Sequence, residues 1–105
     1  RHFIRGFFDG DGCFSAVKPK NRNREYAKIF IASGEIIIDF IINRIYQSTG
    51  VLMSKDTYGK LYRCNCQNED GCLKIIKYMY EDATVYLDRK KELIDSYMQR
   101  YSLNI

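Results

Sequence analysis

The sequence has no apolar run that approaches the ~18 residues of a membrane-spanning helix, and no secretory signal peptide is visible. It also has no internal repeat, no low-complexity tract and no linker, so one domain is expected over residues 1–105. Nothing in the composition is typical of a secreted protein, so we expect reduced thiols and an intracellular location, in the cytoplasm, the nucleoid or an organelle.

Cysteine is scarce, with four residues in the whole chain. The spacing of Cys64, Cys66 and Cys72 matches no common zinc ribbon. Cys64 and Cys66 share one face of an expected strand, which is typical of cysteines that act as small buried hydrophobic residues. The sequence therefore does not predict a zinc site.

The overall charge is moderately basic, with 17 Lys and Arg against 13 Asp and Glu and a net charge of +4. This excess permits nucleic-acid binding without requiring it. The hydrophobic content of 46% is sufficient for a real core. The chain begins at Arg1 without a Met, and the first expected helix begins almost at once, so we expect a fragment of a longer protein.

Hydrophobic periodicity and turn residues predict helices alternating with two hairpins. Asn68 or Asp70 can cap the third helix, and Gly50 can end the second. The expected elements are a helix over 2–9, strands over 13–20 and 26–33 joined by a turn over 19–24, a helix over 35–49, a second hairpin within 51–67 turning near 58–59, and helices over 71–81 and 86–101. This order predicts an α+β domain, with helices on one face of an antiparallel sheet and the other face free.

Basic residues gather on the two expected hairpins, with tyrosines among them. A two-stranded ribbon can enter a DNA major groove and contact phosphates and guanines with Lys and Arg. The alternative is a solvated hairpin edge, where Lys only blocks edge-to-edge pairing. The residues are Lys18, Lys20, Arg22, Arg24, Tyr26 and Lys28 on the first hairpin, and Lys55, Tyr58, Lys60, Tyr62 and Arg63 on the second.

The segment FIRGFFDGDGCF, residues 3–14, is an apolar run that ends in two carboxylates. Asp9 and Asp11 fall at the C-terminal end of a helix, where the helix dipole is already negative, so a bound cation is expected. An EF-hand counted from Asp9 fails, because Cys13, Phe14 and Lys20 occupy positions where a ligand, a glycine and a glutamate are needed. The alternative is that both carboxylates serve only the local turn.

Gly6 and Gly10 lie four residues apart and therefore on one helix face, where small residues let two helices approach closely. If two copies packed about a two-fold axis, both Asp11 carboxylates would meet near the helix end. Such a pair repels unless a cation or a proton compensates, and hard oxygen ligands favour Mg²⁺. Metal ions held this way suit hydrolysis of a phosphodiester.

The nine residues IRGFFDGDG, 4–12, resemble the motif of the LAGLIDADG homing endonucleases. The match includes Gly6, Asp9, Asp11 and Gly12, and the expected element order is similar to the family core. Arg5 and Phe8 are mild departures. The resemblance implies a saddle of antiparallel strands lying in the DNA major groove, with motif helices forming the interface between two units. Members with one motif are typically homodimers.

The resemblance also implies roles for single residues. Asp11 would be the metal ligand, with the Gly10 carbonyl beside it, and Asp9 would have a structural role. A basic residue from the start of the last helix would complete the site, which points to Lys90 or, failing that, to Arg89 or Lys91. The family often has a polar, water-ordering residue after the second strand. Here that stretch is 32–35, in which Gly34 has no side chain and Ser33 or Glu35 would have to serve.

The leading interpretation is a Mg²⁺-dependent, homodimeric endonuclease domain that cleaves both strands of double-stranded DNA at a specific site. The second is a non-cleaving DNA-binding domain of a transcription regulator, with a helix-turn-helix domain elsewhere in the parent chain. An RNA maturase is a third, which the sequence does not separate from the second. Intein splicing is disfavoured, because the chain does not begin with Cys or Ser or end in His-Asn.

Overall fold

The computed structural model of the protein describes residues 2–21, 23–81 and 88–103, leaving aside the side chains of residues 2, 7, 9–11 and 88. The element order is α-β-β-α-β-β-α-α, as the sequence predicted. The elements are α1 His2–Asp11, β1 Gly12–Val17, β2 Tyr26–Ser33, α2 Glu35–Thr49, β3 Ser54–Tyr58, β4 Leu61–Cys66, α3 Glu69–Tyr80 and α4 Asp88–Arg100.

Most element boundaries follow from caps and turns that the sequence contains. Gly50 ends α2 in the left-handed conformation, with a φ of 78°, and its N–H donates to the Tyr46 carbonyl. Asn68, rather than Asp70, is the N-cap of α3, and its Oδ1 accepts from the Gly71 N–H at 2.6 Å. β1 ends at Val17 instead of residue 20, since Pro19 has no N–H for the ladder. Residues 86 and 87, where the last helix was expected to begin, lie outside the described residues.

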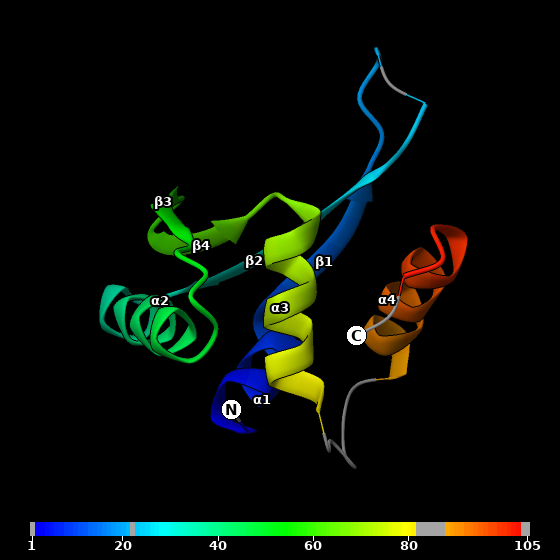
Figure 1. Ribbon diagram of the computed structural model, residues 1–105. Helices are drawn as coiled ribbons and strands as arrows, with labels where there is room; N and C mark the ends of the chain where they lie inside the picture. The colour runs from blue at the N-terminus through cyan, green and yellow to red at the C-terminus, as the bar shows by residue number, and fades with distance from the viewer. Residues whose placement is uncertain (1, 22, 82–87, 104–105) are drawn as a thin grey trace.

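The strands form one antiparallel sheet in the order β1-β2-β4-β3. The helices lie on one side of this sheet, with α3 across its middle and α4 beside β1 (Figure 1). Alternate residues of β2 are buried beneath the helices, namely Ala27, Ile29 and Ile31. Register puts Phe14 of β1 and Cys64 of β4 on that same face. The opposite, open face is only partly buried, which agrees with the predicted α+β arrangement.

The core lies between the sheet and the helices. α2 contributes Ile38, Ile41 and Ile45, which have an exposed fraction of 0%. Cys64, Cys66 and Cys72 are buried free thiols, as expected for small hydrophobic residues. Within the described chain, no helix is both long enough and apolar enough to cross a membrane.

Candidate functional site

The end of α1 packs tightly against the start of β1. Phe8 is fully buried, and a Cβ atom added to Gly12 would lie 2.4 Å from its Cδ1 and 2.8 Å from its carbonyl oxygen. Position 12 therefore requires glycine. The backbone of Asp9, Gly10 and Asp11 forms the last turn of α1, two residues beyond the predicted helix end. The side chains of these three residues lie outside the described part of the structure.

Lys90 of α4 reaches this last turn of α1. Its Nζ donates a hydrogen bond to the Phe8 carbonyl oxygen at 2.5 Å and lies 5.2 Å from the centroid of the Phe8 ring. The last carbonyls of a helix lack partners within the helix, and a cation there compensates the negative end of the dipole. Of the other two basic residues considered, Lys91 forms an ion pair with Asp95 at 2.6 Å, and Arg89 is exposed.

The end of β2 is occupied by an ion-pair cluster. Lys55 Nζ lies 2.8 Å from both the Glu35 and the Asp39 carboxylates. Hydrogen bonds to Asp39 and to Glu35 raise the pKa of Lys55 above its usual range. Gly34 caps α2 without any side chain, so Glu35 and the half-buried Ser33 are the polar side chains at this end.

Two predicted DNA-binding residues point to the helix side of the sheet. Lys55 stands opposite Cys64 in the β3–β4 register, and neighbouring residues across an antiparallel pair share a face. Arg24 forms an ion pair with Glu69 of α3 at 2.8 Å, and its guanidinium lies 4.3 Å from the Tyr101 ring centroid. Both side chains are thus engaged by carboxylates of the helices and lie outside the proposed DNA-facing set.

The open face brings together Tyr26, Lys28 and Phe30 of β2 with Arg63 and Asn65 of β4. Arg63 donates two hydrogen bonds to Asp56 of β3, at 3.0 and 2.8 Å. Asp56, Phe30 and Asn65 were not identified from sequence. Asn65 could have been predicted from the sequence. It follows Arg63 by two residues in a strand, and residues two apart in a strand share a face.

The remaining predicted basic residues lie toward the hairpin ends. Lys18 and Lys20 are exposed beyond the end of β1, and Lys60 is exposed between β3 and β4. Figure 1 shows the first hairpin projecting well beyond the helices. Arg22 falls outside the described residues.

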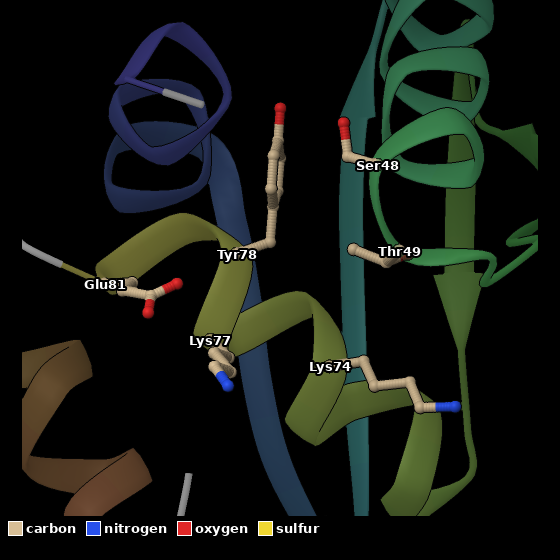
Figure 2. Close-up of a pocket in the computed structure, with 6 residues that line it drawn as sticks. All are labelled: Ser48, Thr49, Lys74, Lys77, Tyr78 and Glu81. Carbon is tan, nitrogen blue, oxygen red and sulfur yellow. The ribbon is translucent and has the colours of Figure 1, made fainter.

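A surface hollow of about 330 Å³ lies between α2 and α3, on the helix side of the molecule. Figure 2 shows Ser48 and Thr49 of α2 facing α3, with Lys74 and Tyr78 of α3 across from them and Glu81 farther away. None of the predicted site residues lines it. Among the described residues, no group of three His, Cys, Asp or Glu side chains could hold a metal ion.

Solved structures resemble the chain over nearly its whole length. The LAGLIDADG meganuclease I-AabMI, bound to uncleaved DNA, is 23% identical with a TM-score of 0.68, and the match covers 96% of this chain and 37% of that one. The homing endonuclease I-TnaI is 13% identical, with a TM-score of 0.67 and coverage of 95% and 72%. The archaeal intron-encoded homing endonuclease I-Vdi141I, complexed with DNA, is 16% identical, with a TM-score of 0.67 and coverage of 92% and 63%.

The chain has the LAGLIDADG homing endonuclease fold. It spans little more than a third of the length of I-AabMI, since the match covers 37% of that chain. No family model and no curated protein matches the sequence. In the LAGLIDADG fold of this chain, α1 is the motif helix, and it contains the predicted residues Gly6, Asp9, Gly10 and Asp11.

The motif helix keeps one side open. Gly6 is exposed, and a Cβ atom added there would meet nothing within 4 Å. Phe3 on the same helix is 56% exposed and packs edge-to-face against Phe40 of α2, with ring centroids 5.6 Å apart. An open, apolar helix side with a glycine is available for close packing against another helix.

Proposed function

We propose that this chain is a domain of a site-specific DNA endonuclease that acts as a homodimer and cleaves both strands with Mg²⁺ or another divalent cation. The observation that carries the proposal is the hydrogen bond from Lys90 to the Phe8 carbonyl. It brings a cation from the last helix to the turn that contains Asp9 and Asp11. A lysine close to a helix end whose sequence carries carboxylates is suited to phosphodiester hydrolysis.

Double-stranded DNA is the proposed substrate. I-AabMI and I-Vdi141I have this fold and were solved with DNA. The open sheet face of this chain carries Lys28 and Arg63, and the net charge of the chain is +4. Tyr26 belongs to the proposed DNA-facing set through its place on this face, and Lys18, Lys20 and Lys60 through their exposed places toward the hairpin ends. Arg22 belongs to it by its position in the sequence.

The proposed metal ligands are Asp11 and the carbonyl oxygen of Gly10. Both are hard oxygen donors at a helix end where carbonyls lack helical partners, and this donor chemistry fits Mg²⁺. A second copy packed on the open side of α1 would supply further ligands from its own motif helix. When bound, Mg²⁺ would activate water and stabilise the leaving oxygen.

The protein side chains have separate proposed tasks. Lys90 would stabilise negative charge that develops on the phosphate, or would help to activate water. Asp9 would have a structural role at the end of α1. Gly6 and Gly10 would allow the close approach of the two motif helices, and Gly12 allows the sharp passage from α1 into β1.

The second candidate is a DNA-binding protein that does not cleave. Its support is the end of β2, where Gly34 has no side chain and Glu35 is held in an ion pair with Lys55 at 2.8 Å. Gly34 therefore cannot order water with a side chain, and the Glu35 carboxylate is engaged by Lys55, which leaves Ser33 for that role. A helix-turn-helix domain in a longer parent chain would fit this candidate.

The test is Mg²⁺-dependent cutting of a large randomised DNA library, with Asp11→Asn as the control. Cut ends enriched at a pseudo-palindromic sequence, and absent with Asp11→Asn or with EDTA, support the homodimeric endonuclease. If bound sequences are enriched but none is cut, the non-cleaving binder is correct. If Asp11→Asn cuts as fast as the parent, the proposed metal role of Asp11 is wrong.

A further inference from the structure

The guanidinium of Arg63 in β4 is fixed on the open face by groups from β2 and β3. Its Nε donates to Asp56 Oδ1 at 3.0 Å and its Nη2 to Asp56 Oδ2 at 2.8 Å. Its Cζ lies 5.1 Å from the Tyr58 ring centroid and 5.4 Å from that of Phe30. Because these contacts already restrict the side chain, little rotamer entropy remains to be lost when it binds a ligand.

Asp56, which accepts the two hydrogen bonds from Arg63, is fixed in turn by a neighbouring side chain. It accepts a further hydrogen bond from Asn65 Nδ2 at 3.3 Å, and Asn65 is only 4% exposed. The hydrogen bonds from Arg63 lower the pKa of Asp56, and the charge of Lys28 contributes further. Arg63 therefore has an ionised, anchored carboxylate on one side of its guanidinium.

The Arg63 side chain is 23% exposed, and its bonds to Asp56 occupy only one edge of the guanidinium. An arginine has five N–H donors, and the two bonds to Asp56 use the Nε proton and one Nη2 proton. The remaining Nη1 and Nη2 protons form an end-on fork. This is the geometry with which arginine binds O6 and N7 of guanine in a DNA major groove.

We propose that Arg63, oriented by Asp56, is a specificity-determining residue that reads a guanine in each half-site of the DNA target. The inference rests on the proposed function, in that the open face must meet double-stranded DNA. The pair of opposite charges is nearly neutral as a unit, so its contribution is to sequence choice more than to general attraction by phosphates. The major groove of duplex RNA is too deep and narrow for this contact, which makes DNA the partner.

Binding-site selection from a randomised duplex DNA library tests the proposal. The whole chain is used in an Asp11→Asn background, so that bound DNA is not cut. The variants are Arg63→Lys, which keeps the charge but loses the planar fork, and Asp56→Asn, which removes the carboxylate that orients it. The matched control is Lys60→Ala, which removes an exposed cation from the same hairpin.

The parent is expected to select a guanine at one fixed position of each half-site. Arg63→Lys should weaken that preference by on the order of tenfold or more, and Asp56→Asn should relax the same position only. Lys60→Ala should weaken binding to all sites alike and keep the guanine. Thermal melting of each variant confirms that it is folded, and Asp56→Asn carries the test if Arg63→Lys does not fold.

Two outcomes would overturn the inference. If both Arg63→Lys and Asp56→Asn select the same guanine as the parent, DNA binding stands and the assignment to Arg63 is wrong. If neither the parent nor any variant enriches any DNA sequence, the proposed function fails together with this inference.

Discussion

Lys90 donates a hydrogen bond to the carbonyl oxygen of Phe8 across 82 residues of sequence. The contact joins the first turn of α4 to the last turn of α1. It supplies a positive charge where the backbone of α1 is most negative. The same contact brings the amino group to the turn that contains Asp11, so it links the stability of the domain to its proposed chemistry.

Substitution of Lys90 by Met should reduce cutting by about 10² or more, because the proposed mechanism loses the positive charge that would stabilise the phosphate. DNA binding should change little. The free energy of unfolding should fall by about 1–2 kcal/mol, since the Phe8 carbonyl loses its donor. Cutting rates and urea denaturation provide the measurements.

Lys91→Met is the matched control for Lys90. Lys91 is one residue away and forms a surface ion pair with Asp95, which is expected to contribute less than about 1 kcal/mol. It should cut DNA at nearly the parent rate. Equal losses of activity in the two variants would mean that Lys90 has no special place at the site.

Substitution by alanine should affect the stability of the protein differently at two glycines of the motif. Gly12→Ala places a Cβ atom 2.8 Å from the backbone oxygen of Phe8, and we expect a loss of about 1–3 kcal/mol of stability. Gly6→Ala meets nothing within 4 Å and should leave the isolated chain as stable or slightly more stable, because alanine favours a helix. Urea denaturation at low protein concentration measures both. A Gly6→Ala loss as large as that of Gly12→Ala would contradict the open side of α1.

Gly6→Leu tests the proposed dimer. The larger side chain would prevent close approach of two motif helices, and its Cβ atom meets nothing within 4 Å inside one chain. We expect sedimentation to shift from the mass of two chains toward that of one. A parent that is a monomer at all concentrations, or a Gly6→Leu variant with an unchanged mass, would remove α1 as the interface.

The rate at which the Cys13 thiol is alkylated can be used to probe access to the open face of the sheet. Cys13 stands opposite Phe30 in the sheet register and is partly exposed, whereas the other three cysteines are buried. Hydrogen bonding with the Cys72 thiol lowers the pKa of Cys66, but Cys66 is only 5% exposed and should be protected. Iodoacetamide should therefore modify Cys13 first in the folded protein, as measured by mass spectrometry.

Bound DNA should slow the modification of Cys13, since DNA would cover this face of the sheet. Unfolding in urea should expose all four thiols and serves as the control. A Cys13 that reacts at the same rate with and without saturating DNA would mean that DNA binds elsewhere.

The raised pKa of Tyr97 leads us to expect that the folded protein becomes less stable in alkali. Burial, together with its 2.6 Å hydrogen bond to Glu69, raises the pKa of Tyr97 above its usual value. Above about pH 10 the unfolded chain loses this proton while the folded chain keeps it, so stability falls as pH rises. The contribution is fully present below about pH 10.

The measurement compares the parent with Tyr97→Phe. Near neutral pH the variant should be less stable by about 1 kcal/mol, through the lost hydrogen bond. The difference should shrink as pH rises above about 10. A difference that does not change with pH would mean that the hydroxyl does not stay protonated in the folded state.

The helices and strands were predictable because they depend on local pattern. The spacing of Ile38, Ile41 and Ile45 identified α2, and Gly50 identified its end. Asn68 could not be separated from Asp70 as the cap of α3, since both residues can accept from a backbone N–H and only the start of the helix decides between them.

Side-chain direction on the hairpins was less predictable, because it depends on partners that are distant in sequence. Arg24 binds Glu69, 45 residues away, and Lys55 binds Glu35, 20 residues away. Helix periodicity could in principle have identified Lys90, rather than Arg89 or Lys91, as the basic residue that faces the core. Lys90 precedes the buried Ile94 and Tyr97 by four and seven residues, and that spacing puts it on the buried face of α4.

Helix α4 lies far along the chain and yet packs against β1, the first strand. Tyr97 meets Phe14 with ring centroids 5.8 Å apart, and Arg100 pairs with Glu25 at 2.9 Å. A ribosome makes β1 long before α4, so the core beside β1 stays incomplete until the last helix has been released. A prematurely terminated product would lack both this cover and Lys90. The proposed nuclease activity would therefore be absent until α4 has been synthesised and has packed against β1.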